Sequence, residues 1–193
     1  MTPKPTEHLH GTTSFFDSYF DDLRRHLTDA DAKALDRVSQ TFAAVRDRGR
    51  KVLVAGNGGS AAIASHVAVD LTKAVSIRSV NFNEAGLITC FANDYGYEQW
   101  LAKAIEAYGD AGDVAVLISS SGRSPNMLNA ARRAAELGLT VVTLSGFDHD
   151  NPLRWLGEQN LWVNSRSYNI VETVHQTWLL AAMDRLLVVG DLA

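Results

Sequence analysis

The sequence predicts an α/β fold in which a three-layer, doubly wound and mostly parallel sheet is covered by helices on both faces. Three observations support this prediction. Short apolar, β-branched runs alternate along the chain with longer segments of helical periodicity. Two of these runs, 51–55 and 114–118, are apolar almost throughout, as expected for strands buried on both faces. Each run is followed by a glycine-rich or serine-rich turn that leads into a helix.

The N-terminal part of the chain is expected to precede the sheet. Residues 1–13 contain two of the four prolines and are predicted to form a flexible tail. Residues 14–49 contain two apolar series at helical spacing and are predicted to form two amphipathic helices. Residues 50–193 supply the α/β core, so 14–193 is predicted to be one domain, which agrees with the length of 193 residues.

Within the core, the first strand at 51–55 is expected to lead into a helix of small residues at 61–73. A weaker strand signal lies at 78–82. The strand at 114–118 precedes a helix that begins after Ser124, a good N-cap residue followed by proline. The remaining expected elements are strands at 140–144 and 160–163 and a final helix at 170–189.

The final helix carries apolar residues around most of its circumference. A helix of this kind is normally buried on all sides. One face would be enough to cover the sheet of so small a domain. The rest of its apolar surface is therefore predicted to lie at an interface between subunits of a homo-oligomer.

Composition excludes several classes of protein. The chain has 18 lysines and arginines, 22 acidic residues and a net charge of −4, with no dense basic segment, so direct nucleic-acid binding is not expected. Its one cysteine, Cys90, excludes an intrachain disulfide and favours a reducing compartment. No segment resembles a signal peptide or a membrane span. A cytoplasmic location with no membrane partner is predicted.

Two loops at the ends of expected strands are candidates for phosphate binding. The loop 56–60 combines glycines, which let a ligand approach the backbone, with the N-terminus of a helix. The loop 119–124 brings four serine hydroxyls to the start of another helix. The alternatives are a turn that needs glycine for its geometry and a polar loop with one capping serine. Both loops lie where open α/β sheets bind ligands, so a phosphorylated small molecule is predicted.

The first loop also satisfies the dinucleotide-binding pattern G-x-G-x-x-A through Gly56, Gly58 and Ala61. Glu84 is a candidate for the acidic residue that normally follows in that pattern. A nicotinamide-dependent oxidoreductase is therefore one alternative. The lysine of nucleotide triphosphatase loops is absent from this segment.

Three segments in order, 56–61, 92–98 and 118–126, resemble the sugar isomerase (SIS) domain, and the resemblance covers about residues 15–188. More narrowly, they are similar to the phosphoheptose isomerase group, which converts sedoheptulose 7-phosphate to a heptose phosphate. The resemblance implies a homotetramer with sites between subunits. It also implies that the substrate is bound by Asn57, Gly58, Gly59, Ser60, Asp94, Ser119, Ser120, Ser121 and Ser124.

The resemblance further implies a zinc site. His66 and Asp70 are four residues apart and share one face of a helix. They match zinc-binding positions of the group, and Asp70 matches the carboxylate proposed as the proton-transfer base. The alternative for His66 is a polar stripe on a surface helix.

Glu172 and His175 form a second pair at helical spacing. Together with His66 and Asp70 they would supply two oxygens and two imidazoles, which suits zinc or another divalent metal. Our hypothesis is that Glu172 joins this metal site or acts as an acid, and that His175 is a fourth ligand or an acid/base group. A buried interface histidine is the alternative for His175. The resemblance places a catalytic histidine where this chain has Leu180.

Our main functional hypothesis is a phosphosugar aldose–ketose isomerase that transfers a proton through an enediol. The alternative suggested by Leu180 is a non-catalytic relative that binds phosphosugars or, as some relatives of the group do, the bacterial replication initiator protein. The oxidoreductase described above is the third hypothesis.

Overall fold

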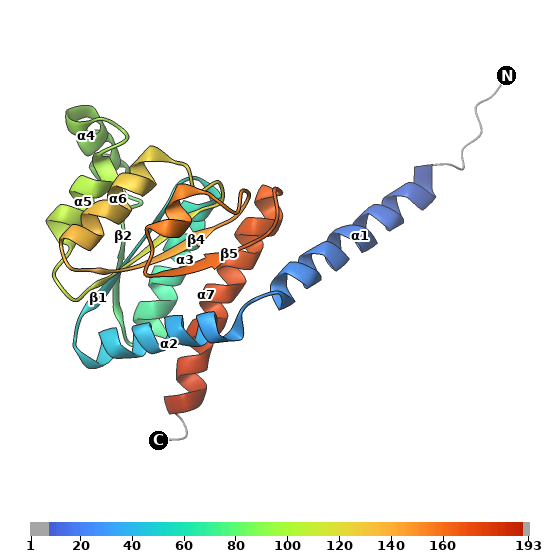
Figure 1. Ribbon diagram of the computed structural model, residues 1–193, viewed down its shortest axis with the longest axis horizontal. Helices are drawn as coiled ribbons and strands as arrows, with labels where there is room; N and C mark the ends of the chain where they lie inside the picture. The colour runs from blue at the N-terminus through green and yellow to red at the C-terminus, as the bar shows by residue number, and fades with distance from the viewer. Residues whose placement is uncertain (1–7, 191–193) are drawn as a thin grey trace.

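The computed structural model describes residues 8–190, with side chains described for 14–188. Its centre is a five-stranded parallel sheet in the order β2-β1-β3-β4-β5. Helices cover both faces of this sheet, so the predicted three-layer, doubly wound fold is confirmed (Figure 1). The strands are β1 (Lys51–Gly56), β2 (Arg78–Asn81), β3 (Val114–Ser119), β4 (Thr140–Ser145) and β5 (Gln159–Trp162).

The order of the strands reverses at β1 and β3, because β2 lies on one side of this pair and β4 and β5 lie on the other. The register pairs Gly56 of β1 with Ile118 of β3. The loops that follow the two strands therefore leave the same edge of the sheet next to each other. This is the topological switch point at which open α/β sheets bind ligands.

Two apolar clusters hold the layers together. On one face of the sheet the core is built with α2 (Ala32–Asp47), α3 (Gly59–Lys73) and α7 (Tyr168–Gly190). On the other face it is built with α5 (Trp100–Tyr108) and α6 (Pro125–Glu136). The central strand β3 is buried over its whole length, as its apolar sequence predicts.

Three elements between the expected ones were not predicted. They are α4 (Ala85–Tyr95), α5 and a short 3₁₀ helix, η1 (Pro152–Trp155). None of the residues of α4 is buried, although the helix is rich in apolar side chains. Cys90 on α4 is exposed.

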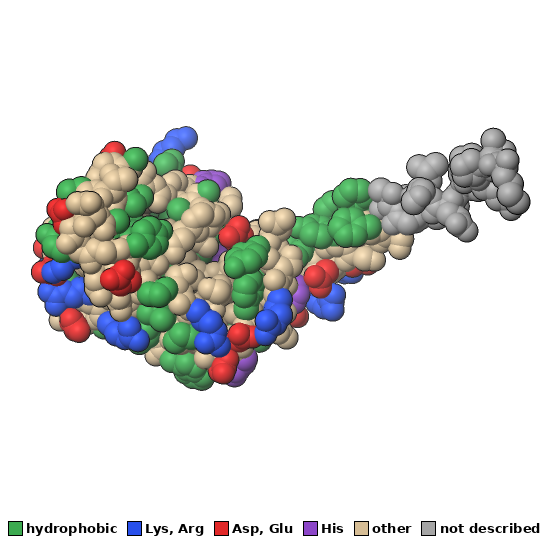
Figure 2. Space-filling view, turned by 90° about the horizontal axis from the view of Figure 1, so that it is seen from above, with side chains coloured by type: hydrophobic (Ala, Val, Ile, Leu, Met, Phe, Trp, Pro, Cys, Tyr) green, Lys and Arg blue, Asp and Glu red, His purple; other side chains and the backbone are tan. Residues whose placement is uncertain are grey.

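The first helix, α1 (His8–Thr28), begins inside the segment 1–13 that was predicted to be a tail. Residues 1–7 lie outside the described residues. Figure 1 shows α1 projecting from the body of the subunit. Its last turns pack on the core through Leu23 and Leu27, whereas Phe16 and Phe20 are 51% and 60% exposed. The projecting part of α1 therefore presents aromatic side chains to solvent, and Figure 2 shows green apolar side chains on this projecting part.

The apolar circumference of α7 is used mostly within the subunit. Val171, Val174 and Leu179 are fully buried in the core, and Trp178 donates a hydrogen bond from Nε1 to the carbonyl oxygen of Leu27 at 3.1 Å. Among the described residues of α7, large apolar side chains are exposed at its first residue, Tyr168, and near its end, at Leu187 and Val188. None of the helices in residues 8–190 is both long enough and apolar enough to cross a membrane.

Candidate functional site

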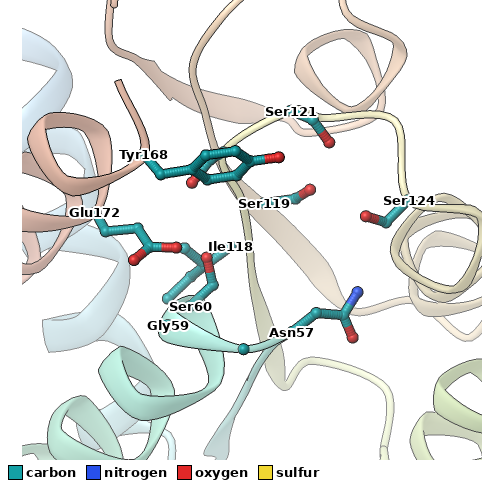
Figure 3. Close-up of a pocket in the computed structure, with 11 residues that line it drawn as sticks. Asn57, Gly59, Ser60, Ile118, Ser119, Ser121, Ser124, Tyr168 and Glu172 are labelled. Atoms are coloured by element: carbon teal, nitrogen blue, oxygen red, sulfur yellow. The ribbon is translucent and has the colours of Figure 1, made fainter. Parts of the chain in front are cut away.

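A cavity of about 370 Å³ lies at the carboxyl ends of β1 and β3, between the two predicted phosphate loops and the start of α7 (Figure 3). All of the predicted substrate-binding residues line it except Asp94. Two lining residues, Ile118 and Tyr168, were not predicted. The lining consists of Asn57, Gly58, Gly59, Ser60, Ile118, Ser119, Ser120, Ser121, Ser124, Tyr168 and Glu172.

The serine loop between β3 and α6 keeps its hydroxyl groups available. Ser119 and Ser120 are buried, and Ser120 Oγ has no hydrogen-bond partner among the described residues. Ser124 is the N-cap of α6, but its side chain makes no capping hydrogen bond. Gly122 turns the loop with φ of +61°, and its N–H donates to the carbonyl oxygen of Ser119 at 3.0 Å. Because the helix N-terminus adds positive potential, this loop forms a cup suited to a phosphate group.

The glycine loop between β1 and α3 leaves room for a side chain from α7. Gly58 is the N-cap of α3 with φ of +57°. A Cβ atom at Gly59 would collide with the carboxylate of Glu172. Glycine at position 59 therefore lets Glu172 approach the first turn of α3. Ser60 is buried beside it.

Glu172 is the one carboxylate in the lining of this cavity. Figure 3 shows it across the cavity from Ser124. Partial burial raises the pKa of the Glu172 carboxyl above its usual value. A raised pKa suits a group that accepts and returns a proton near neutral pH. The ring of Tyr168 lies above the cavity, against Phe147 at 4.8 Å between ring centroids.

His66 and Asp70 lie outside the lining of the cavity. They share one face of α3 as predicted, with 3.1 Å between His66 Nε2 and Asp70 Oδ2. His66 Nδ1 lies 2.9 Å from Nε2 of Gln176 on α7. Both ring nitrogens of His66 therefore have a partner. Gln176 was not predicted, although it lies one helical turn after Glu172 on the same face.

His175, predicted as a metal ligand or acid/base group, is not brought to the cavity of its own subunit. His175 is fully buried, and its Nε2 lies 3.0 Å from the carbonyl oxygen of Ser145. Burial lowers the pKa of His175 to about 4. The alternative prediction was a histidine buried at an interface between subunits. His175 is buried, but its ring packs inside the core of its own subunit.

The four-residue metal site predicted from His66, Asp70, Glu172 and His175 does not form within one subunit. In residues 8–190 no three histidine, cysteine or acidic side chains gather closely enough to share a metal ion. His66 and Asp70 come together, Glu172 faces the cavity, and His175 points into the core.

The buried His175 predicts a pH-dependent stability. Its pKa is about 4 in the folded chain and ordinarily 6.5, so only the unfolded chain binds this proton between these values. The contribution of neutral His175 to the free energy of unfolding is complete above pH 6.5. This free energy falls by about 3 kcal/mol as the pH drops to 4. Urea unfolding should show this slope in the wild type. His175→Gln, whose amide can still donate to the Ser145 carbonyl, should lose it.

The matched control for this experiment is His149→Gln, which changes an exposed histidine. It should keep the wild-type slope between pH 6.5 and 4. An unchanged slope in His175→Gln would contradict the assignment of the slope to His175.

Asp94 and Leu180 also lie outside the lining of the cavity. Asp94 is exposed on α4, where its Oδ1 accepts from Asn93 Nδ2 at 2.9 Å, so it is not brought to the cavity of its own subunit. Leu180 is half-buried and packs against the apolar core. Arg123, in the serine loop, pairs with Asp148 at 3.4 Å and with Asp150 at 3.5 Å.

Comparison with known proteins agrees with this geometry. Residues 15–146 match the family model described as the SIS domain. The chain is 32% identical over 168 residues to a phosphoheptose isomerase from Fusobacterium nucleatum, covering 84% of this chain and 86% of that protein. A phosphoheptose isomerase from Helicobacter pylori is 39% identical over 132 residues, covering 65% of this chain and 68% of that protein.

The fold comparison gives the same result. The solved structure of a phosphoheptose isomerase from Neisseria gonorrhoeae superposes with a TM-score of 0.84 at 26% identity, covering 91% of this chain and 99% of that chain. The family match covers more than half of the chain, and the predicted resemblance is confirmed. The chain therefore belongs to the SIS-domain family, in the group similar to phosphoheptose isomerases.

Proposed function

We propose that the protein is a phosphosugar aldose–ketose isomerase that acts on sedoheptulose 7-phosphate or a ketose phosphate of similar length. One observation carries the proposal. A single cavity holds a cup of serine hydroxyls at one side and the carboxylate of Glu172 at another (Figure 3). Phosphosugar isomerase activity agrees with the names of the relatives, and the choice of a seven-carbon sugar rests on those names.

The serine cup would bind the phosphate group and supply binding energy far from the reacting carbons. Ser120 Oγ is buried and has no partner among the described residues, so a phosphate oxygen would satisfy it. The N-terminus of α6 adds favourable potential for an anion. Energy gained here can position the other end of the sugar for reaction.

Glu172 would move the proton. The carboxylate removes a proton from C1 of the ketose while the oxygen on C2 takes a proton from water, which gives an enediol. Glu172 then returns its proton to C2 as the hydroxyl on C1 gives its proton to water and becomes the aldehyde oxygen. The raised pKa of Glu172 suits both transfers near neutral pH. The first turn of α3 beside it offers helix N–H groups to the developing negative oxygen.

This assignment differs from the prediction that Asp70 is the base. Asp70 pairs with His66 on α3 and does not line the cavity, whereas Glu172 does. No step of the mechanism above passes through a metal ion, because the four predicted ligands do not converge within the subunit.

A divalent metal ion remains a separate proposal for the pair formed by His66 and Asp70. Binding would require release of the contact that His66 makes with Gln176 or with Asp70. Metal analysis of protein purified without a histidine tag tests this. Stoichiometric metal that disappears in His66→Ala supports the site, and substoichiometric metal that is unaffected by this change contradicts it.

The proposed assembly is a cytoplasmic homo-oligomer, with the tetramer of the predicted resemblance as the expected form. Phe16 and Phe20 on the projecting α1 are more than half exposed, which favours contact with another copy of the chain. The double variant Phe16→Ser/Phe20→Ser should reduce the mass measured by light scattering, whereas Trp155→Ser, at another exposed aromatic, should not. A monomeric wild type would contradict the proposal.

The test of the proposed function is direct. Purified protein is mixed with sedoheptulose 7-phosphate or, in separate reactions, with each member of a panel of shorter ketose phosphates. Aldose formation is followed in every reaction. Turnover of the seven-carbon substrate is expected to be fastest. Absence of turnover with every member of the panel would contradict the proposal.

A second candidate is a binding module without catalytic activity, which Leu180 favours because leucine cannot transfer a proton. Such a protein would bind the phosphosugar without turnover, or would retain the replication initiator in a pull-down experiment. The nicotinamide alternative would require tight nucleotide binding, which cofactor fluorescence detects.

A further inference from the structure

A pair of asparagine amides, one half-buried and one buried, joins the glycine loop to the first turn of α6. Asn57 follows β1, and Asn126 lies in the first turn of α6. We propose that Asn126 is a positioning residue that holds the side chain of Asn57 as a hydrogen-bond donor toward a phosphoryl oxygen of the ligand. The proposal rests on the phosphate site of the proposed function, but it does not depend on the isomerisation step.

The two amides bind each other reciprocally. Asn57 Nδ2 donates to Asn126 Oδ1 at 3.0 Å, and Asn126 Nδ2 donates to Asn57 Oδ1 at 2.9 Å. Asn126 is only 1% exposed. It contributes nothing to the lining of the main cavity, whereas Asn57 does. Any effect of Asn126 on a ligand in that cavity is therefore expected to pass through Asn57.

A third residue completes the hydrogen bonding of the Asn57 oxygen. The hydroxyl of Tyr97, from the loop between α4 and α5, donates to Asn57 Oδ1 at 3.3 Å. An amide oxygen has two lone pairs, and its NH₂ group has two hydrogens. Oδ1 of Asn57 is thus fully used by Asn126 and Tyr97, and one hydrogen of Nδ2 is used by Asn126. The hydrogen-bonding capacity that remains on the side chain of Asn57 is therefore one N–H donor.

This remaining donor fixes the kind of atom that Asn57 can recognise. Figure 3 shows the amide nitrogen of Asn57 directed toward Ser124, a member of the serine cup. A phosphoryl oxygen held by that cup is an acceptor, and hydrogen bonds to charged acceptors are about twice as strong as neutral ones. Without Asn126, the amide could rotate and present its oxygen to the phosphate, which would be unfavourable.

The proposal is tested by a double-mutant cycle with inorganic phosphate and sedoheptulose 7-phosphate as the probes, measured by titration calorimetry on the full chain. Asn126→Ala in the wild-type background should weaken binding of either probe by about tenfold, the loss of one hydrogen bond to a charged group. In the Asn57→Ala background the same change should alter binding by less than about twofold. In turnover, KM should rise and kcat should remain close to the wild-type value.

The matched control is Asn129→Ala, one turn further along α6. Asn129 donates to the carbonyl oxygen of Glu98 at 3.0 Å and does not contact Asn57. It should leave the binding of both probes unchanged. Thermal unfolding without ligand reports the stability of each variant, and Asn126→Ser replaces Asn126→Ala in the cycle if the alanine variant does not fold.

An equal loss of binding in both backgrounds, or no loss in the wild-type background, would overturn the proposal. A wild type that binds inorganic phosphate but does not isomerise the sugar would contradict the proposed function alone. The cycle with inorganic phosphate would then still decide the role of Asn126.

Discussion

Replacement of Glu172 by glutamine is expected to lower kcat for ketose phosphate isomerisation by about 10²- to 10⁴-fold, the usual contribution of a general base. Glutamine keeps the size of the side chain and the fit against Gly59, but it cannot accept the proton from the sugar. The serine cup is untouched, so KM should change by less than about threefold. Steady-state kinetics with sedoheptulose 7-phosphate measure both constants.

The matched comparison is Asp70→Asn, which makes the same chemical change in a carboxylate outside the cavity lining. The effect of this variant on kcat should be much smaller than that of Glu172→Gln. The reverse order would contradict the assignment of Glu172 and would favour Asp70 as the base.

Replacement of Gly122 by alanine is expected to weaken the binding of phosphate esters by about 10- to 100-fold. Gly122 has φ of +61°, a conformation that costs an L-residue roughly 1–2 kcal/mol. An added Cβ would also collide with the side chain of Asn151. Asn151 is fully buried, and its Nδ2 donates to the carbonyl oxygen of Asp148 at 2.8 Å, so it has no room to retreat. The serine loop must therefore move, and the cup loses its shape.

The control for this prediction is Gly138→Ala, which lies after the other end of α6. Gly138 has φ of +78°, but an added Cβ would meet only Ala111, at 3.5 Å or more. This variant should lose stability without a change in affinity for phosphate esters once it is folded. Equal losses of affinity in both variants would show that the effect is not specific to the serine loop. Titration with sedoheptulose 7-phosphate gives the two affinities.

Much of the fold could be predicted because its signals are local. The strands at 51–55 and 114–118 are apolar runs that end in turn residues, and both were placed to within one residue. The helix α5 was missed although Trp100, Leu101 and Ile105 have helical spacing and are buried. The helix α4 buries none of its residues, so its apolar pattern says little about packing within one subunit.

The rotation of α7 about its axis could not be predicted. One residue along a helix turns a side chain by about 100°. His175 therefore faces Ser145 in the core, whereas its neighbour Gln176 reaches His66. The sequence of α7 contains residue types that can bind a metal or transfer a proton, at helical spacing. Packing of the whole helix against α2 and α3 decides which of these residues face α3.

The loops of the site were predicted well because each is a short segment between one strand and one helix. The contacts between them were not predicted. Asn57 and Asn126 are 69 residues apart, and His66 and Gln176 are 110 residues apart. Such pairs depend on the order of the strands in the sheet, which a single sequence pattern does not encode.

Isomerisation of sedoheptulose 7-phosphate in D₂O, followed by NMR, tests whether Glu172 transfers the proton. Proton transfer through an enediol by Glu172 predicts an aldose product that carries deuterium at C2, because the carboxylate exchanges its proton with solvent. The label should appear at a greatly reduced rate with Glu172→Gln. A product without deuterium at C2, or no product at all, would contradict proton transfer through an enediol by Glu172.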